Sequence, residues 1–218
     1  EACFKVIAPA LKATALLMDV GSTKADIVAA ALNTLGDKLP CFVPVHPIAG
    51  KEVAGVEHSD ADLYKDRALI VTPMASSGAT QVELAKQIWK SLGSYITELT
   101  PTEHDAAFAA VSHLPHVLSY AIIRGIFQQH NGPELMALGG PGFRDFSRIA
   151  ASDPVVWRDI LTTNRDQVLL QINHFKDALN EFEKAIQDNE PQALEDMIRQ
   201  ASDLRFNWRM GSSQNPEK

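Results

Sequence analysis

The sequence predicts an α/β segment followed by an all-α segment, with the change near residue 100. Before that point, short apolar runs alternate with stretches of helical periodicity, which is typical of strands joined by helices in a mostly parallel sheet. After it, no strand pattern recurs. The motif "TPTE" marks the change, because Thr100 and Glu103 form a capping box and Pro101 occupies the first helical position.

The first half is expected to build a small sheet with helices packed on it. Its strands are apolar runs, the strand at 67–73 being stopped by Pro73, and its helices show apolar residues three and four apart. The expected elements, in chain order, are a helix at 1–11, a strand at 15–20, a helix at 24–35, strands at 41–45 and 67–73, a helix at 82–92 and a strand at 95–99.

The second half begins with a long apolar helix, expected from 101 to about 129 and kinked at Pro115. The segment "GGPGF" at 139–143 is expected to be a loop. Several of the helices are apolar on more than one face, which favours dimerisation through this half.

The last helices have clear starting signals. Asp153 followed by Pro154 predicts a helix that continues to about 188, and Pro191 predicts the start of another. The polar segment 211–218 is expected to be a disordered tail. The expected domains are therefore 1–100 and 101–210, with that tail after them.

Composition limits the class of function. The chain has 218 residues, of which 45% are hydrophobic and 22% charged, and its net charge of -7 argues against binding to nucleic acid or an anionic membrane. No apolar run is expected to approach the roughly 20 residues that span a bilayer. Cys3 and Cys41 form no CxxC pair, which fits a reduced, cytoplasmic protein.

His46 and Ser22 each come directly after a predicted strand, where open α/β sheets gather their ligands. If the two strands are neighbours, the imidazole and the hydroxyl face one crevice, and a neutral imidazole there can accept a proton from a substrate hydroxyl. The alternative is a turn histidine bonded to the backbone, which the spacing alone favours slightly. His104 is interpreted as a surface residue of a first helical turn, and His58, His130 and His174 receive no role.

The segment "SHLPH" at 112–116 places three polar side chains inside the apolar helix. His113 and His116 share a helix face, but no further ligand lies nearby, so a metal site is not expected. Because polar side chains in an apolar helix need partners, we expect Ser112, His113 and His116 to form a polar cluster facing a cleft.

Arg144 and Arg148 lie four residues apart, with Asp145 beside them. A guanidinium binds a carboxylate in two places, so one such arginine aimed into a cleft would anchor an anionic substrate. A surface ion pair with Asp145 or Asp153 is an equally favoured alternative. The sequence contains no GxGxxG and no GxxxxGK[ST] motif.

Taken in order, the motifs of this chain resemble those of the prephenate/arogenate dehydrogenase family of tyrosine biosynthesis. The matching motifs are "DVGSTK" at 19–24, "HPIAG" at 46–50, "TP" at 72–73, "EHD" at 103–105, "SHLPH" at 112–116 and "GFRDFSRIAASDPVVWRD" at 142–159.

This resemblance implies an oxidoreductase that uses NAD or NADP to oxidise and decarboxylate prephenate to 4-hydroxyphenylpyruvate, or arogenate to tyrosine. It also implies that 1–100 is the C-terminal part of a Rossmann-like nucleotide-binding domain. The segment 101–210 would be a helical domain that forms a homodimer and binds substrate. The choice between the two substrates, and between NAD and NADP, stays open.

The resemblance implies roles for individual residues. His46 matches the catalytic histidine that accepts a hydrogen bond from the ring hydroxyl as hydride leaves, and Ser22 matches a catalytic serine that helps to hold both. Ser22 and Lys24 are expected at the cofactor. The residues expected to bind or surround the substrate are His116, which orients its side chain, Arg148, which binds its carboxylate, and Ser112 and His113. Asp145 and Trp157 match residues that line the site, some of them presented across the dimer. Pro141 stands where the family often has a glycine.

Family members carry GxGxxG upstream of the strand that here ends at Val20, and this sequence is expected to lack that segment. We therefore expect the 218-residue chain to bind NAD(P) weakly or not at all. The alternative function is a non-catalytic dimerisation or ligand-sensing fragment that has lost its cofactor. The intact His46, Ser22 and Arg148 argue against that alternative. Among enzymes, another β-hydroxyacid-type dehydrogenase is the next candidate, which "SHLPH" and "FRDFSRIA" disfavour.

Overall fold

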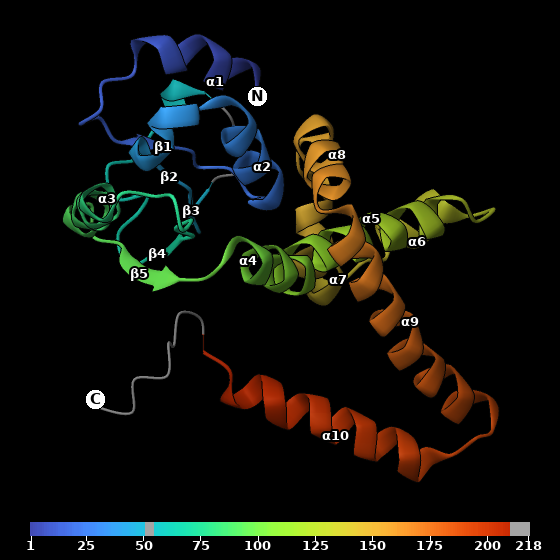
Figure 1. Ribbon diagram of the computed structural model, residues 1–218. Coiled ribbons are helices and arrows are strands. Elements are labelled where there is room, and N and C mark those ends of the chain that lie inside the picture. The colour runs from blue at the N-terminus through green and yellow to red at the C-terminus, as the bar shows by residue number, and fades with distance from the viewer. Residues whose placement is uncertain (51–54, 210–218) are drawn as a thin grey trace. The chain divides into compact units, whose positions relative to one another are not determined.

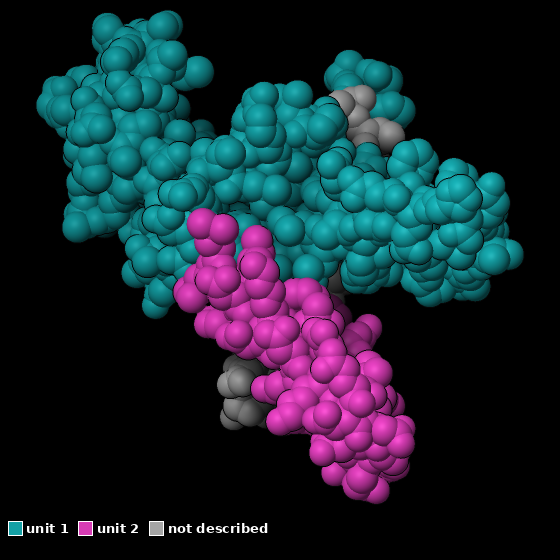
Figure 2. Space-filling model, turned by 90° about the vertical axis from the view of Figure 1, so that its right-hand side faces the viewer, with its two compact units in different colours: residues 1–168 teal, residues 169–218 magenta. Residues whose placement is uncertain are grey.

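The computed structural model describes residues 1–50 and 55–209 (Figure 1). The expected tail at 211–218 lies outside the described residues. By contacts, the chain divides into two compact units, residues 1–168 and 169–218 (Figure 2). The boundary between these units, at residue 168, does not coincide with the change from α/β to all-α structure near residue 100. The first helices of the second half belong to the same unit as the sheet.

The predicted strands are all present, in a parallel pair and a three-stranded sheet. β1 (Leu17–Met18) pairs in parallel with β2 (Phe42–Val43). β3 (Val45–Pro47), β4 (Ala68–Val71) and β5 (Tyr95–Glu98) lie in the order β3-β4-β5. The run expected at 41–45 is thus divided at Pro44 into β2 and β3.

One strand departs from the expected parallel arrangement. β4 is parallel to β5 but antiparallel to β3, with His46 opposite Ile70. A parallel pair needs a crossover connection, usually a helix, whereas an antiparallel pair needs only a loop. In its described part, the connection from β3 to β4 contains only the short 3₁₀ turn Val56–His58.

Three helices of the first half confirm the predicted ones within a few residues. They are α1 (Ala2–Ile7), which continues as a 3₁₀ turn, α2 (Ala25–Thr34) and α3 (Ala79–Ser91). α3 contacts β2 and β5, whereas α1 contacts α2. The buried side chains form two clusters, one of Val43, Val45, Leu69, Val71, Ala85 and Trp89, the other of Phe4, Ala31, Leu35 and Phe42. The α/β class of this half is confirmed.

The long helix begins with the predicted capping box. Thr100 Oγ1 accepts a hydrogen bond from the Glu103 N–H at 3.2 Å, and the Glu103 carboxylate accepts one from the Thr100 N–H at 2.8 Å. The helix consists of α4 (Pro101–Phe108), a π-helical turn (Ala109–His113) and α5 (Leu114–Phe127). Pro115 has no N–H and crowds the preceding turn, so the expected interruption takes the form of a wider turn before it.

The helical run Pro101–Phe127 corrects the expectation about apolar length. An 18-residue window of this run has a mean hydropathy of 1.4, enough by length and composition to cross a membrane, and only 17% of the window is buried. The same run carries the buried polar residues His104, Asp105 and His113. Because these side chains bond to other parts of the first unit, we interpret the run as a protein-packing helix.

The remaining helices are α6 (Gly132–Ala137), α7 (Pro141–Ser147), α8 (Pro154–Thr163), α9 (Arg165–Gln187) and α10 (Pro191–Asn207). The expected loop at 139–143 is wrong from Pro141 onward, because proline is well suited to the first position of a helix. Asp153 caps α8 as predicted, its Oδ1 accepting from the Val155 and Val156 N–H groups at 2.8 and 2.9 Å.

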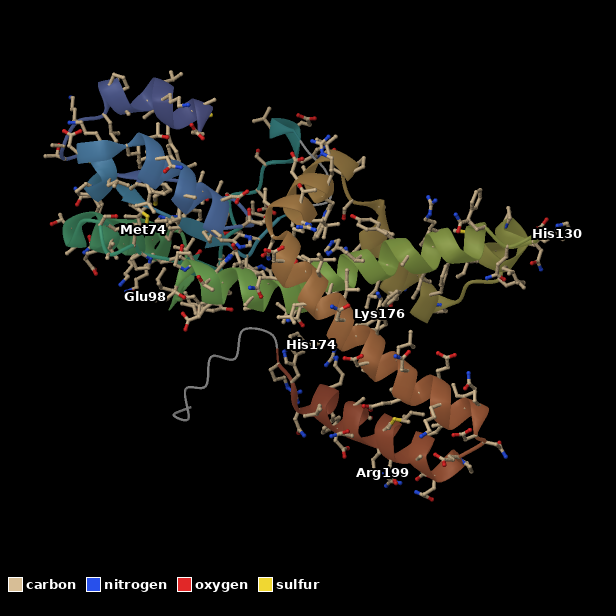
Figure 3. The ribbon with its side chains drawn as sticks, turned by 45° about the vertical axis from the view of Figure 1, so that its right-hand side comes forward. Met74, Glu98, His130, His174, Lys176 and Arg199 are labelled. Atoms are coloured by element: carbon tan, nitrogen blue, oxygen red, sulfur yellow. The ribbon has the colours of Figure 1, made fainter. Side chains whose placement is uncertain are left out.

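The helix expected from 154 to about 188 is broken at Asn164, which separates α8 from α9. The predicted start of a helix at Pro191 is confirmed. In the second unit, the exposed side chains of His174 and Lys176 project from α9 and that of Arg199 from α10 (Figure 3).

We expect Thr100→Ala to lower the free energy of unfolding by about 1 kcal/mol, because it removes the side-chain half of the capping box. Urea denaturation monitored by circular dichroism measures this change. Thr102→Ala, at an exposed position of the same helical turn, is the matched control. Equal effects of the two substitutions would contradict the capping role.

Candidate active site

A cavity of about 730 Å³ lies in the first unit, at the end of β3. The segment 46–50 forms one part of its wall, and the π-helical turn, α5 and residues between 148 and 160 form the rest. The residues singled out from the sequence that line it are Ser22, His46, Ser112, His113, His116, Arg148 and Trp157. The structure therefore brings together side chains from widely separated motifs.

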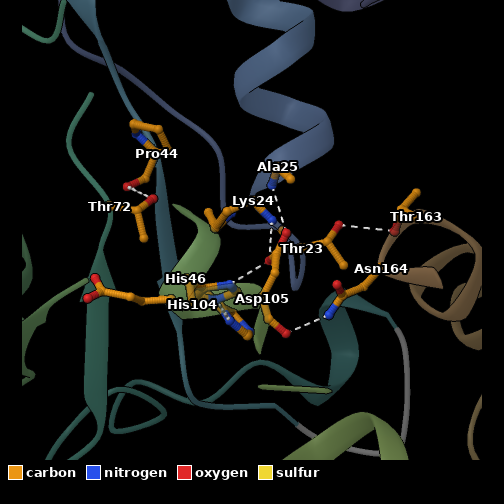
Figure 4. Close-up of polar contacts among 12 residues, drawn as sticks. Thr23, Lys24, Ala25, Pro44, His46, Thr72, His104, Asp105, Thr163 and Asn164 are labelled. Atoms are coloured by element: carbon orange, nitrogen blue, oxygen red, sulfur yellow. Dashed lines mark hydrogen bonds and ion pairs between the residues drawn. The ribbon is translucent and has the colours of Figure 1, made fainter. Parts of the chain in front are cut away.

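His46 is bonded to a second histidine that was expected on the surface. His46 Nδ1 lies 2.8 Å from His104 Nε2, and His104 Nδ1 lies 2.8 Å from Asp105 Oδ1 (Figure 4). The side chain of His104 is fully buried. The expectation of a surface position was wrong because the first turn of α4 packs against the α/β part of the chain.

The Asp105 carboxylate also caps a helix that lies 80 residues away in the sequence. It accepts hydrogen bonds from the N–H groups of Lys24 and Ala25, both at 2.8 Å, at the start of α2. Burial opposes the ionised form of Asp105, but the hydrogen bonds from His104 and from these two amides outweigh it and hold its pKa below the usual range. Asp105 is therefore a carboxylate at neutral pH.

Burial also determines the charge of His46. Desolvation, and after it repulsion from His104, Lys24 and His113, lowers the pKa of His46 to about 3. The imidazole is thus neutral at pH 7 and keeps a lone pair to accept a proton or a hydrogen bond.

Lys24 lies behind the cavity wall rather than in it. Its side chain is fully buried, and its Nζ lies 2.5 Å from Asp19 Oδ2. Asp19 also accepts from the N–H groups of Gly21 at 2.9 Å and Val45 at 3.2 Å. The Asp19 carboxylate therefore ties the loop that carries Ser22 to the strand that carries His46. The expected place of Lys24 at a cofactor stays a prediction.

Asn164, which had no predicted role, joins the same network from the break between α8 and α9. Its Nδ2 donates to the carbonyl oxygen of Asp105 at 2.7 Å and lies 3.1 Å from His113 Nδ1. Both amide hydrogens are thereby used, so His113 Nδ1 is an acceptor and its Nε2 carries the hydrogen. Burial lowers the pKa of His113 to about 4.

His116 and Trp157 form an aromatic wall of the cavity. Their rings stack with centroids 3.5 Å apart, and His116 Nδ1 lies 2.9 Å from the Ser112 carbonyl oxygen. The side chains of His113 and His116 thus have polar partners, and Ser112, His113 and His116 all line the predicted cleft. Burial lowers the pKa of His116.

The two arginines predicted as alternatives have different surroundings. Arg148 lines the cavity, whereas Arg144 Nε donates to Asp145 Oδ1 at 3.0 Å on the exposed surface. Asp145 does not line this cavity within the single chain, and its expected place at the site, where some residues are presented across the dimer, stays a prediction. Among residues 1–50 and 55–209, no group of three His, Cys, Asp or Glu side chains is arranged to hold a metal ion.

Comparisons with known proteins agree on one family. The profile described as "prephenate dehydrogenase, nucleotide-binding domain" matches residues 1–98, and "prephenate dehydrogenase, dimerization domain" matches residues 100–200. The cyclohexadienyl dehydrogenase of Zymomonas mobilis is 32% identical over 204 residues, covering 92% of this chain and 68% of that protein. The prephenate dehydrogenase of Bacillus subtilis is 30% identical over 87% of this chain, which spans only 51% of that protein.

A solved structure is also similar. The prephenate dehydrogenase of A. aeolicus, in complex with hydroxyphenyl propionate and NAD+, superposes with a TM-score of 0.86 at 34% identity. The match covers 94% of this chain and 71% of that one. Its identity and coverage support the fold throughout both halves.

We expect the free energy of unfolding to fall as the pH is lowered from 7 to 5. The unfolded chain gains a proton on His113 as the pH passes about 6.5, whereas the folded chain resists protonation down to about pH 4. His113→Asn should reduce this loss by about 1–2 kcal/mol, measured as the difference between urea denaturations at the two pH values. Substitution of the exposed His174 by Asn is the control variant. A His113→Asn variant with the wild-type pH dependence would contradict this interpretation.

Proposed function

Since this chain belongs to the prephenate dehydrogenase family, we propose that its cavity binds prephenate or arogenate for NAD(P)-dependent oxidative decarboxylation. The observation that carries this proposal is the meeting of a neutral, half-buried His46 with Arg148 at one cavity. An imidazole that accepts from a hydroxyl and a guanidinium that binds a carboxylate are the two groups such a substrate requires.

The reaction requires no covalent bond between the protein and the substrate. The hydroxyl-bearing ring carbon loses hydride to NAD(P)+, and the bond from the ring to its carboxylate breaks to release carbon dioxide. The electron pair of that bond enters the ring, which becomes aromatic. His46 accepts a hydrogen bond from the ring hydroxyl and so stabilises the positive charge that develops there, while the hydroxyl keeps its proton in the product.

The other cavity residues orient the substrate. Arg148 binds a carboxylate, and the stacked rings of His116 and Trp157 form a flat surface against which the substrate packs. Ser22, which lines the same cavity as His46, offers a hydroxyl to the substrate hydroxyl. Holding the ring in one orientation supplies much of the rate enhancement in a reaction of this kind.

The residues near Ser22 also fit a nicotinamide. The wall continues from Ser22 through Pro47, Ile48 and Ala49, which offer an apolar surface beside one hydroxyl. The match of residues 1–98 to a nucleotide-binding domain supports this assignment. NAD(P)+ supplies the hydride acceptor when bound, and Ser22 is the residue we assign to its reactive end.

The chain contains the family's dimerization domain, and we place a homodimer interface on the helical half. α5 exposes Ile122 and Phe127, and α10 exposes Ile198, Leu204 and Phe206. A second copy that covers such apolar side chains removes them from water, which is the main driving force for association. Cys3 and Cys41 are both free thiols, which supports the proposed cytoplasmic location.

We expect His46→Asn to lower kcat by about 10²–10⁴-fold, because the substituted side chain no longer accepts from the ring hydroxyl in the same geometry. The rate is measured as the formation of reduced nicotinamide with prephenate or arogenate. Binding of hydroxyphenyl propionate, measured by calorimetry, should persist in the variant. Turnover at the wild-type rate would remove His46 from the reaction. Calorimetric binding without turnover in the unaltered chain would favour a ligand-sensing role.

We expect Arg148→Gln to raise KM by about 10- to 100-fold, the loss of a charged hydrogen bond of about 1.5–3 kcal/mol. Initial rates over a range of substrate concentrations measure this effect. Arg144→Gln is the matched control, because Arg144 lies one helical turn away and pairs with Asp145 on the surface. Equal KM values for the two variants would place the carboxylate elsewhere.

A further inference from the structure

We propose that His104 and Asp105 are positioning residues that hold His46 in the tautomer whose Nε2 is free to accept from the substrate. The catalytic consequence rests on the proposed function. The tautomer itself depends on contacts within this chain and can be tested without substrate. The three side chains form a line, Asp105 to His104 to His46, joined by two hydrogen bonds of 2.8 Å each (Figure 4).

The hydrogen of His104 is placed by its carboxylate partner. The Asp105 carboxylate already accepts from two backbone N–H groups at the start of α2 and has no hydrogen to donate. The imidazole nitrogen that faces it, Nδ1 of His104, must therefore carry a hydrogen. In neutral His104 the other nitrogen, Nε2, is then a pure acceptor.

The hydrogen of His46 is placed in turn by His104. Nδ1 of His46 faces the acceptor Nε2 of His104, so Nδ1 must carry the hydrogen. The lone pair of His46 is thereby left on Nε2. His46 lines the cavity, and Nε2 is its remaining ring nitrogen for a ligand. The line of three residues thus places the acceptor at the nitrogen that does not face His104.

Packing prevents other arrangements of these rings. Phe108 stacks on His104 with centroids 4.5 Å apart and contacts the ring of His46 at 4.9 Å. The side chain of His104 is fully buried, so water does not replace either of its partners. Asp105 is held in turn by α2 and, through its carbonyl oxygen, by Asn164.

The same line also responds to charge at the cavity. As His46 accepts from the substrate hydroxyl, its Nδ1–H becomes a stronger donor to His104. Asp105 is the negative group behind this line, and its charge opposes the lowering of the His46 pKa by burial. His104 and Asp105 therefore act on the reaction only through His46.

The direct test is the tautomer of His46, measured by NMR on the full chain with ¹⁵N-labelled histidine. The ring signals of His46 are assigned by their loss in His46→Asn. We expect the hydrogen of His46 on Nδ1 in the unaltered chain. In His104→Phe, which keeps an aromatic ring against Phe108 but removes the acceptor, the hydrogen should move partly or wholly to Nε2. A hydrogen on Nε2 of His46 in the unaltered chain would overturn the proposal.

Kinetics give a second, independent test. His104→Phe should lower kcat by at least about tenfold, since the wrong tautomer of His46 lacks the lone pair that accepts from the substrate hydroxyl, and KM should change less than about threefold. When His104→Phe is added to His46→Asn, kcat should fall little further, because His104 acts through His46. Ser119→Ala, which removes another buried hydrogen bond from α5, is the control for general destabilisation.

The outcomes separate the two proposals. If the unaltered chain binds both NAD(P)+ and substrate without turnover but His46 carries its hydrogen on Nδ1, the proposed function fails and the positioning role of His104 stands. If turnover is normal and His104→Phe leaves both kcat and the tautomer unchanged, the positioning role fails and the function stands. Full additivity with His46→Asn would also overturn the positioning role.

Discussion

The structure around the cavity depends on the carboxylate of Asp105. Removing an ionised carboxylate from water is costly unless hydrogen bonds replace the lost hydration, and here the N–H groups of Lys24, Ala25 and His104 do so. Each of these donors belongs to a segment that positions a cavity residue. Two begin the helix next to the Ser22 loop, and the third orients the histidine behind His46. A single buried charge therefore relates the nucleotide-binding half to the helical half.

The parts of the site that have a local signal could be predicted from the sequence. Ser22 and His46 were predicted because the apolar runs before them placed each directly after an expected strand, although His46 lies within β3. The Thr100 cap was predicted because its four residues contain both partners. His104, Asn164 and the role of Lys24 have no such signal. The positions of His104 and Asn164 are decided by partners more than 50 residues away, and that of Lys24 by a buried ion pair. The antiparallel β3 was missed because strand direction depends on how the chain returns, which periodicity does not report.

The π-helical turn Ala109–His113 has a positional effect on the site. One extra residue in a turn rotates the later part of a helix relative to the earlier part, and here it lies between His104 and His116. His113 turns inward to Asn164, while His116 stacks on Trp157. The low buried fraction of the same run leaves apolar surface for another subunit. One irregular helix thus serves both the cavity and the proposed interface.

The cap that Asp105 places on α2 bears on how this protein can be divided. Sequence profiles separate the two halves at residues 98 and 100, as if they were interchangeable modules. A fragment ending there would leave the first amides of α2 without their acceptor and Lys24 without a nearby second carboxylate. The complementary fragment would expose Asp105 to water without its donors from α2. The two halves match separate profiles, but each completes hydrogen bonds of the other. A chimaera of two family members would have to take Lys24 and Asp105 from the same parent.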